Sequence, residues 1–202
     1  MFRHFDRYLN LKELILNEKP SVVMECGAGN GELTRALSGL KALHSFDLHV
    51  ITDKALSDIP GVTWRIGVSY KELSKLPEDS IDLCIIDTDH NYWTLMRELM
   101  VLDSRMKEGG VMAFHDVMSF YYDTGMAMSY WDGEPYPEES IRANVGKGGV
   151  GCGLIDFLSA YRHRYQLERW VPDSCGAALI RRKNAAYANI VTPAKGSPFA
   201  QV

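Results

Sequence analysis

Two groups of ionisable side chains stand directly after apolar runs of the sequence, in a pattern that suits acid–base or metal-assisted chemistry. Asp87, Asp89 and His90 follow the run IDLCII, and His115 and Asp116 follow the run VMAF. Carboxylates that share a small volume raise one another's pKa values unless a cation compensates them. Carboxylate oxygens bind divalent cations, and an imidazole can take a proton from a hydroxyl group. The two groups therefore predict a site for proton transfer, metal binding or both.

A third feature is the glycine-rich segment ECGAGNG at residues 25–31, which joins an apolar run directly to a helical pattern. Glycine permits positive φ and lets a ligand approach the backbone closely. The dinucleotide fingerprint G-x-G-x-x-G, counted from Gly27, needs its last glycine where this chain has Glu32, an anion that would repel a pyrophosphate. Asp47 lies 20 residues after Gly27, where a carboxylate accepts hydrogen bonds from ribose hydroxyls. We therefore expect a nucleoside ligand without phosphate, and poor binding of NAD and NADP.

The elements that must position these groups alternate between short apolar runs and helical patterns, which is typical of a parallel sheet covered on both faces. Strands are predicted at residues 21–25, 42–47, 62–67, 81–87, 111–115, 165–171 and 175–181. Helices are predicted around residues 9–18, 32–40, 70–76 and 154–162, and from the N-cap Asn91 to the Gly109-Gly110 pair that would end it. The predicted fold class is α/β, with a doubly wound, mostly parallel, seven-stranded Rossmann-like sheet. Ligands bind at the carboxyl ends of the strands in such sheets, so both acidic groups should face one site.

The regular pattern fails between residues 118 and 153, where aromatic residues, prolines and glycines gather. We expect this segment to cover the substrate as a lid, with aromatic side chains supplying apolar surface and glycines acting as hinges. The alternative is a packed surface excursion. Residues 1–183 are predicted to form a single domain that begins with a helix. The tail at residues 184–202 lacks periodicity and is expected to be disordered.

The composition excludes several classes of function. The 202 residues carry a net charge of −4, which argues against sequence-independent binding of nucleic acid. No apolar stretch approaches ~18 residues, so no membrane span is expected, and the first residues lack the apolar block of a signal peptide. Cys26 and Cys84 lie in apolar runs and are expected to be buried thiols in a reducing compartment. A cytoplasmic protein is therefore expected, and its oligomeric state stays open, a homodimer included.

With residues 25–31 and Asp47 in this order and spacing, the chain resembles the class I methyltransferases that use S-adenosylmethionine. Their first motif is an acidic residue with G-x-G-x-G after the first strand, and a second acidic residue ends the second strand. The resemblance covers about residues 20–182, including Gly109-Gly110 before the fifth strand. It implies that Asp47 binds the ribose and that Ser69 lies near the adenine. The whole set that the resemblance implies around the cofactor is Glu25, Gly27, Ala28, Gly29, Gly31, Asp47, Ser69 and Asp87.

A more specific resemblance rests on D-x-x-H after the fourth strand and the acidic group after the fifth. These motifs look like those of the metal-dependent O-methyltransferases that act on macrolide sugars and of the related cephalosporin hydroxylase-like proteins. The resemblance implies a divalent cation on Asp87, His115 and Asp116, and His90 as the general base beside Asp87. His115 stands where that family usually has a carboxylate, and an imidazole favours manganese, iron or zinc over magnesium, or no metal. The alternative is that Asp87 and Asp116 cap neighbouring helices.

The function that the resemblance implies is transfer of a methyl group to a small-molecule acceptor, at a hydroxyl oxygen. Three alternatives stay open: a binding module of the methyltransferase fold without turnover, a cephalosporin hydroxylase-like protein, and a metal-dependent hydrolase. The Asp87, His90 and Asp116 group favours chemistry over binding alone. A hydrolase would leave Glu25 and Asp47 without a role.

Overall fold

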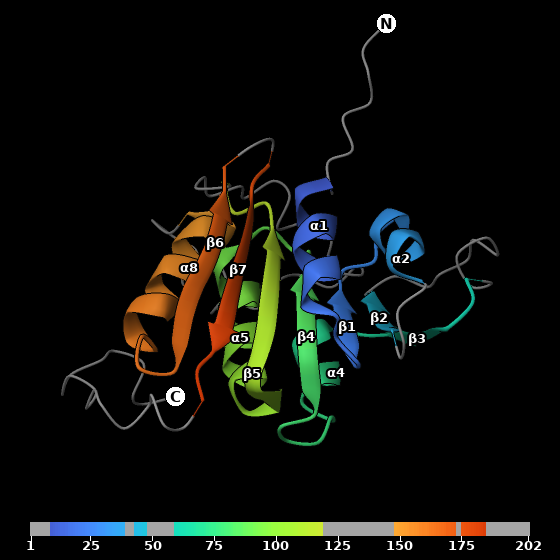
Figure 1. Ribbon diagram of the computed structural model, residues 1–202, viewed down its shortest axis with the longest axis horizontal. Coiled ribbons are helices and arrows are strands. Elements are labelled where there is room, and N and C mark those ends of the chain that lie inside the picture. The colour runs from blue at the N-terminus through green and yellow to red at the C-terminus, as the bar shows by residue number, and fades with distance from the viewer. Residues whose placement is uncertain (1–8, 39–42, 48–58, 119–147, 173–174, 185–202) are drawn as a thin grey trace, which may run out of the picture.

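A computed structural model of the chain describes residues 9–38, 43–47, 59–118, 148–172 and 175–184 (Figure 1). Its helices are α1 (Leu9–Glu18), α2 (Glu32–Leu37), α4 (Ser69–Leu73), α5 (Tyr92–Arg105) and α8 (Gly149–Ala160). Its strands are β1 (Val23–Cys26), β2 (Leu43–Asp47), β3 (Val62–Ile66), β4 (Ile81–Ile86), β5 (Met106–His115), β6 (Tyr165–Val171) and β7 (Ala177–Arg182). No helix within these ranges is long and apolar enough to cross a membrane.

The described strands form a 7-stranded sheet in the order β3-β2-β1-β4-β5-β7-β6. β1 to β5 run parallel to their neighbours, whereas β7 is antiparallel to both β5 and β6. The chain moves outward from β1 to β3 and then returns to β4 on the other side of β1, which is the reversal of a doubly wound sheet. The α/β class and the mostly parallel sheet are therefore confirmed. The reversal lies between β1 and β4, where ligands of such folds bind.

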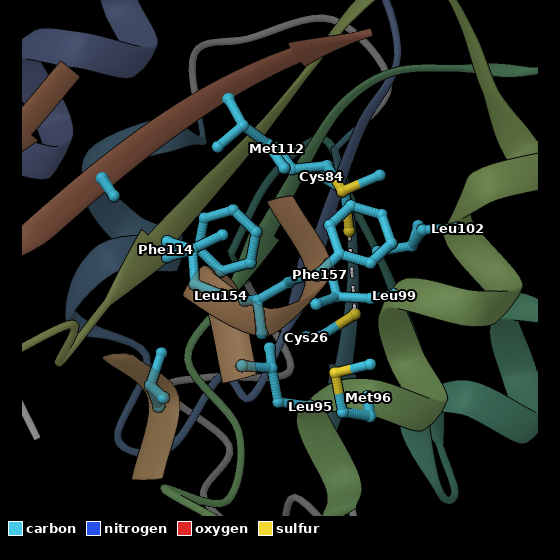
Figure 2. Close-up of a cluster of buried hydrophobic side chains, with 14 of the residues drawn as sticks. Cys26, Cys84, Leu95, Met96, Leu99, Leu102, Met112, Phe114, Leu154 and Phe157 are labelled. Atoms are coloured by element: carbon cyan, nitrogen blue, oxygen red, sulfur yellow. Dashed lines mark hydrogen bonds between the residues drawn. The ribbon is translucent and has the colours of Figure 1, made fainter. Parts of the chain in front are cut away.

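Burial on both faces of the sheet explains why its strands are unbroken apolar runs in the sequence. In β4, Leu83 and Ile85 belong to the core under α1 and α2, while Cys84 and Ile86 belong to the core under α5 and α8. Figure 1 shows α1 on the near side of the sheet and α5 behind it. Figure 2 shows Cys84 among side chains of α5 and α8, with Cys26 nearby. Both thiols are fully buried, as expected from the sequence.

The Gly109-Gly110 pair does not end a helix, contrary to the prediction. α5 gives way directly to β5, which begins with Met106 and contains both glycines. The pairing of β5 with β4 is irregular between Met106 and Val111, so the glycines lie in a bulge. Gly109 has a φ of 76°, and a Cβ on Gly110 would lie 2.8 Å from the carbonyl oxygen of Lys107. Both positions need glycine for the path of the strand.

α8 begins at Gly149, earlier than predicted. Some of the glycines that were expected to act as hinges therefore lie within a helix. A Cβ on Gly153 would lie 2.7 Å from Cδ2 of Leu95, so this glycine lets α8 pack closely on α5. The rest of the predicted lid, residues 119–147, lies outside the described residues. So does the predicted disordered tail from residue 185 onward.

Candidate active site

The carboxyl ends of β1 to β5 meet at one edge of the sheet because these strands run parallel. The register pairs Cys26 with Phe46 on one side and with Ile86 on the other, and Ile86 with Phe114. The turns that follow these positions therefore begin side by side. They are the turns that carry most of the residues predicted for the site.

The turn after β1 has the backbone shape that only glycine adopts readily. Gly27, Gly29 and Gly31 have φ values of 87°, 51° and 74°. A Cβ on Gly27 would overlap the carbonyl oxygen of Asp87, so this turn touches the backbone that follows β4. A Cβ on Gly29 would meet no atom of the described residues within 4 Å, so among them there is space beside this part of the turn.

Glu25 lies beneath the glycine turn and is fully buried. Its Oε2 accepts a hydrogen bond of 2.6 Å from Oγ1 of Thr34, a buried residue of α2. This bond ties the end of β1 to the helix that follows the turn. Ala28 is also buried, so this part of the turn packs against the protein.

Asp47 and Ser69, the residues expected near the ribose and adenine, end β2 and begin α4. Only the backbone of Asp47 is described. Ser69 is buried, and its hydroxyl donates to Oε1 of Glu98 on α5. The Oε2 atom of Glu98 accepts a second hydrogen bond, of 3.0 Å, from Oγ1 of Thr88.

Glu98 was not recognised from the sequence, although a signal for it exists. Leu95, Glu98, Leu99 and Leu102 recur at helical spacing, which places the glutamate on the buried face of α5. Burial raises the pKa of Glu98 to about 8, although the hydroxyls that donate to it act in the opposite direction. This carboxyl is therefore mainly neutral at pH 7.

The two acidic groups of the sequence form one cluster of four side chains. Nε2 of His90 lies 2.8 Å from Oδ2 of Asp116 and 3.9 Å from Oδ1 of Asp87. Nδ1 of His115 lies 2.9 Å from the same Asp116 oxygen and 3.1 Å from Asp87 Oδ1. Asp116 has a φ of 56°, an uncommon conformation for a residue other than glycine, immediately after the end of β5.

The N-cap of α5 is Asn91, whose side chain accepts from the amide of Thr94, and the charges of the four-residue cluster compensate one another. Hydrogen bonds with Asp116 and Asp87 raise the pKa of His90 to about 9. Burial opposes the charged form of His115, but the same two carboxylates outweigh it and raise its pKa to about 10. Burial alone would raise the pKa values of Asp87 and Asp116, but hydrogen bonds from the two imidazoles hold both below their usual range.

The geometry also brings metal-ligating atoms together. One ligand atom each from Asp87, His90 and Asp116 lies within 4.8 Å of the other two. The sequence placed His115 rather than His90 in the ligand set. In the structure Nδ1 of His115 contacts both carboxylates, so all four predicted side chains share one site.

Comparison with known proteins identifies the central part of the chain. A sequence profile of a family described as "Methyltransferase domain" matches residues 24–117. Over these residues the chain is similar to a methyltransferase domain. The match runs from β1 through the end of β5 and includes both the glycine turn and the four-residue cluster. The resemblance to class I methyltransferases is thereby confirmed. No functionally curated protein matches the chain in sequence.

Solved structures resemble this chain over most of its length. A protein from Klebsiella pneumoniae that carries an O-methyltransferase assignment has a TM-score of 0.61 at 16% identity, covering 90% of this chain and 84% of its own. The O-methyltransferase TomG from Streptomyces achromogenes, in complex with S-adenosylmethionine, has a TM-score of 0.59 at 14% identity, covering 87% and 78%. An O-methyltransferase from Bacillus cereus, in complex with S-adenosylhomocysteine, has a TM-score of 0.53 at 16% identity, covering 86% and 79%. At these identities the likeness establishes the fold.

Proposed function

We propose that this methyltransferase transfers a methyl group from S-adenosylmethionine to a hydroxyl oxygen of a small molecule. The observation that carries the proposal is the contact between Gly27 and Asp87, which puts the glycine turn beside the Asp–His cluster. A methyl donor at the turn and an acceptor at the cluster would then be neighbours. The complexes of TomG and of the Bacillus cereus enzyme support both the cofactor and an oxygen acceptor.

The cofactor would bind over the turn after β1. Gly29 has open space beside it for the methionine part, Asp47 would accept hydrogen bonds from the ribose, and Ser69 would lie near the adenine. The first turn of α2 carries Glu32, whose negative charge disfavours a pyrophosphate at this helix. The charge therefore supports a nucleoside cofactor without phosphate over NAD.

His90 is the side chain that we assign as general base. Its side chain is 28% exposed, whereas that of His115 is 3% exposed, so an acceptor can reach His90 more easily. As the acceptor oxygen attacks the methyl carbon, the carbon–sulfur bond breaks and an oxygen–carbon bond forms. The hydroxyl proton passes to the neutral form of His90, which is the minor form at pH 7 because the pKa of His90 is about 9, and S-adenosylhomocysteine leaves. The carboxylate of Asp116, at 2.8 Å, stabilises the imidazolium that results.

A divalent cation is a second proposal for the same cluster. Asp87 and Asp116 supply oxygen ligands, and His90 or His115 supplies a nitrogen ligand. A mixed donor set of this kind suits manganese, iron or zinc better than magnesium. Such a cation would lower the pKa of an acceptor hydroxyl and orient it. The group of ligand atoms that lie within 4.8 Å of one another contains His90, and His115 would then hold the carboxylates in place. A His90 that binds the cation through Nε2 would not also take the proton of the acceptor through that atom.

The test is a turnover assay with radiolabelled S-adenosylmethionine and a panel of catechols, phenols and sugars. The account predicts label in at least one hydroxylated acceptor and formation of S-adenosylhomocysteine. Binding of the cofactor without transfer to any acceptor would favour the binding module. Hydrolysis of an ester or phosphate in the presence of a divalent cation would favour the hydrolase.

A further inference from the structure

Glu98 joins two turns that follow β3 and β4, strands that are separated in the sheet by β2 and β1. Its carboxyl accepts hydrogen bonds from Ser69, the first residue of α4, and from Thr88, the second residue after β4. These bonds span 29 and 10 positions of the sequence, so Glu98 is a cross-link between the β3–α4 and β4–α5 turns. Helices α4 and α5 pack against each other around it.

The burial of Glu98 is costly unless the carboxyl has a specific task. Glutamate is almost never fully buried in proteins, because the ion loses its hydration. Here the side chain is 0% exposed, lies among core residues and faces the negative charge of Asp89. A neutral carboxyl offers one O–H donor and one acceptor oxygen. The ionised carboxyl accepts from both hydroxyls, whereas in the neutral form one of the two contacts reverses, so that Glu98 donates to one hydroxyl and accepts from the other; in both forms it holds Ser69 and Thr88.

Both hydroxyls that Glu98 holds lie at the edge where we place the cofactor. The amide nitrogen of Thr88 is 2.9 Å from the position that a Cβ on Gly27 would take, so Thr88 borders the glycine turn. Ser69 is the residue expected near the adenine. The buried carboxyl of Glu98 thus binds the hydroxyls of Ser69 and Thr88 on two sides of the proposed nucleoside pocket.

We propose that Glu98 is a positioning residue for the cofactor, which sets the affinity for the nucleoside through the hydroxyls of Ser69 and Thr88. This inference rests on the proposed function. Glu98 does not touch the reacting atoms. It keeps the β3–α4 and β4–α5 turns at one fixed separation, so that the pocket need not be ordered by the ligand.

The experiment measures the Kd of S-adenosylhomocysteine by calorimetry, together with the thermal midpoint of each variant. Glu98→Ala should weaken binding roughly tenfold or more, because the buried hydroxyl of Ser69 and the partly buried hydroxyl of Thr88 lose their common partner. Glu98→Gln keeps one donor and one acceptor and should stay within about threefold of the wild type. Adding Ser69→Ala to Glu98→Ala should weaken binding no further, since the two changes remove the same interaction.

The matched control is Asp103→Ala, another acidic residue on α5. Its Oδ2 lies 2.5 Å from Nη1 of Arg164, toward the end of α5 that leads into β5 and away from the carboxyl edge. This variant should lose stability and keep the wild-type Kd. Should Glu98→Ala fail to fold, the single variants Ser69→Ala and Thr88→Val test the same interaction and should each weaken binding.

The possible results separate this inference from the proposed function. If the wild type does not bind S-adenosylhomocysteine, the proposed function falls and takes the inference with it. If the wild type binds and Glu98→Ala or Ser69→Ala binds equally well, only the role of Glu98 is overturned. Equal weakening by Asp103→Ala would also overturn it, because general loss of stability would then explain the effect.

Discussion

A Cβ atom on Gly27 would overlap the carbonyl oxygen of Asp87, so the glycine turn and the acidic cluster are in direct backbone contact. Both partners of this contact are main chain, and neither can rotate away as a side chain would. The register of β1 with β4 enforces the proximity, and the amide of Asp87 donates to the carbonyl of Cys26 at 2.9 Å. A movement of one turn is therefore transmitted to the other.

Replacing Gly27 by Ala tests this contact. The overlap and the φ of 87° should together lower the free energy of unfolding by about 3 kcal/mol or more and abolish cofactor binding. The control is Gly29→Ala, where φ is 51° but no atom of the described residues lies within 4 Å of the added Cβ. This change should lower the free energy of unfolding by only about 1–2 kcal/mol. Chemical denaturation measures both. Equal losses in the two variants would mean that the contact has no special cost.

Replacing Asp47 by Ala tests the ribose site. Loss of hydrogen bonds to the two ribose hydroxyls should weaken binding of S-adenosylhomocysteine by roughly 1.5–3 kcal/mol. The residue is the last of β2, at the end of the strand, so we expect the thermal midpoint to change little. Calorimetry gives the affinity, and an unchanged Kd would remove Asp47 from the site.

The stability of the protein should depend on pH through Glu98. The unfolded chain releases this proton near the ordinary value of 4.5, whereas the folded protein keeps it to about 8. The folded state binds the extra proton between these values, so the contribution is present below pH 4.5 and is lost as the pH rises to about 8. Glu98→Gln has no proton to lose and should gain stability relative to the wild type over this window. Denaturation curves at several pH values measure the difference, and a constant difference would contradict the raised pKa of Glu98.

The cluster itself is tested by removing a cation and by removing side chains. Asp116→Ala should abolish methyl transfer and leave the Kd of S-adenosylhomocysteine nearly unchanged. His90→Ala should lower kcat by about 10²–10⁴, the usual contribution of a general base.

If a cation takes part, a chelator should stop turnover and manganese should restore it. His115→Asp should then shift the preference toward magnesium, because hard cations favour oxygen ligands. Full activity in the chelator would contradict the cation and leave His90 as a base alone.

The strands could be predicted from the sequence because strands that are buried on both faces consist mostly of apolar residues. β6 was predicted with its observed bounds, and β4 to within one residue. The glycine pair at the start of β5 was misread, because a helix end and a bulge both use glycine at positive φ. Distinguishing them requires the pairing with β4, which is not local in sequence.

The site could be predicted as a set of residues, but not in its detailed contacts. Parallel strands bring Asp87, His90, His115 and Asp116 to one edge whatever their rotamers, so the sequence suffices for their proximity. That His115 turns its Nδ1 to both carboxylates is a matter of side-chain rotamers, which the sequence pattern does not specify. Glu98 was missed because its partners lie on other elements, and a glutamate at a buried helical position is rare.

The most direct test of the central claim is a calorimetric titration of the wild-type protein with S-adenosylhomocysteine and, in parallel, with NAD. The account predicts that S-adenosylhomocysteine binds at one site per chain and that NAD binds far more weakly, because Glu32 disfavours a pyrophosphate at the start of α2. Binding of NAD at micromolar concentration, with no binding of S-adenosylhomocysteine, would contradict it.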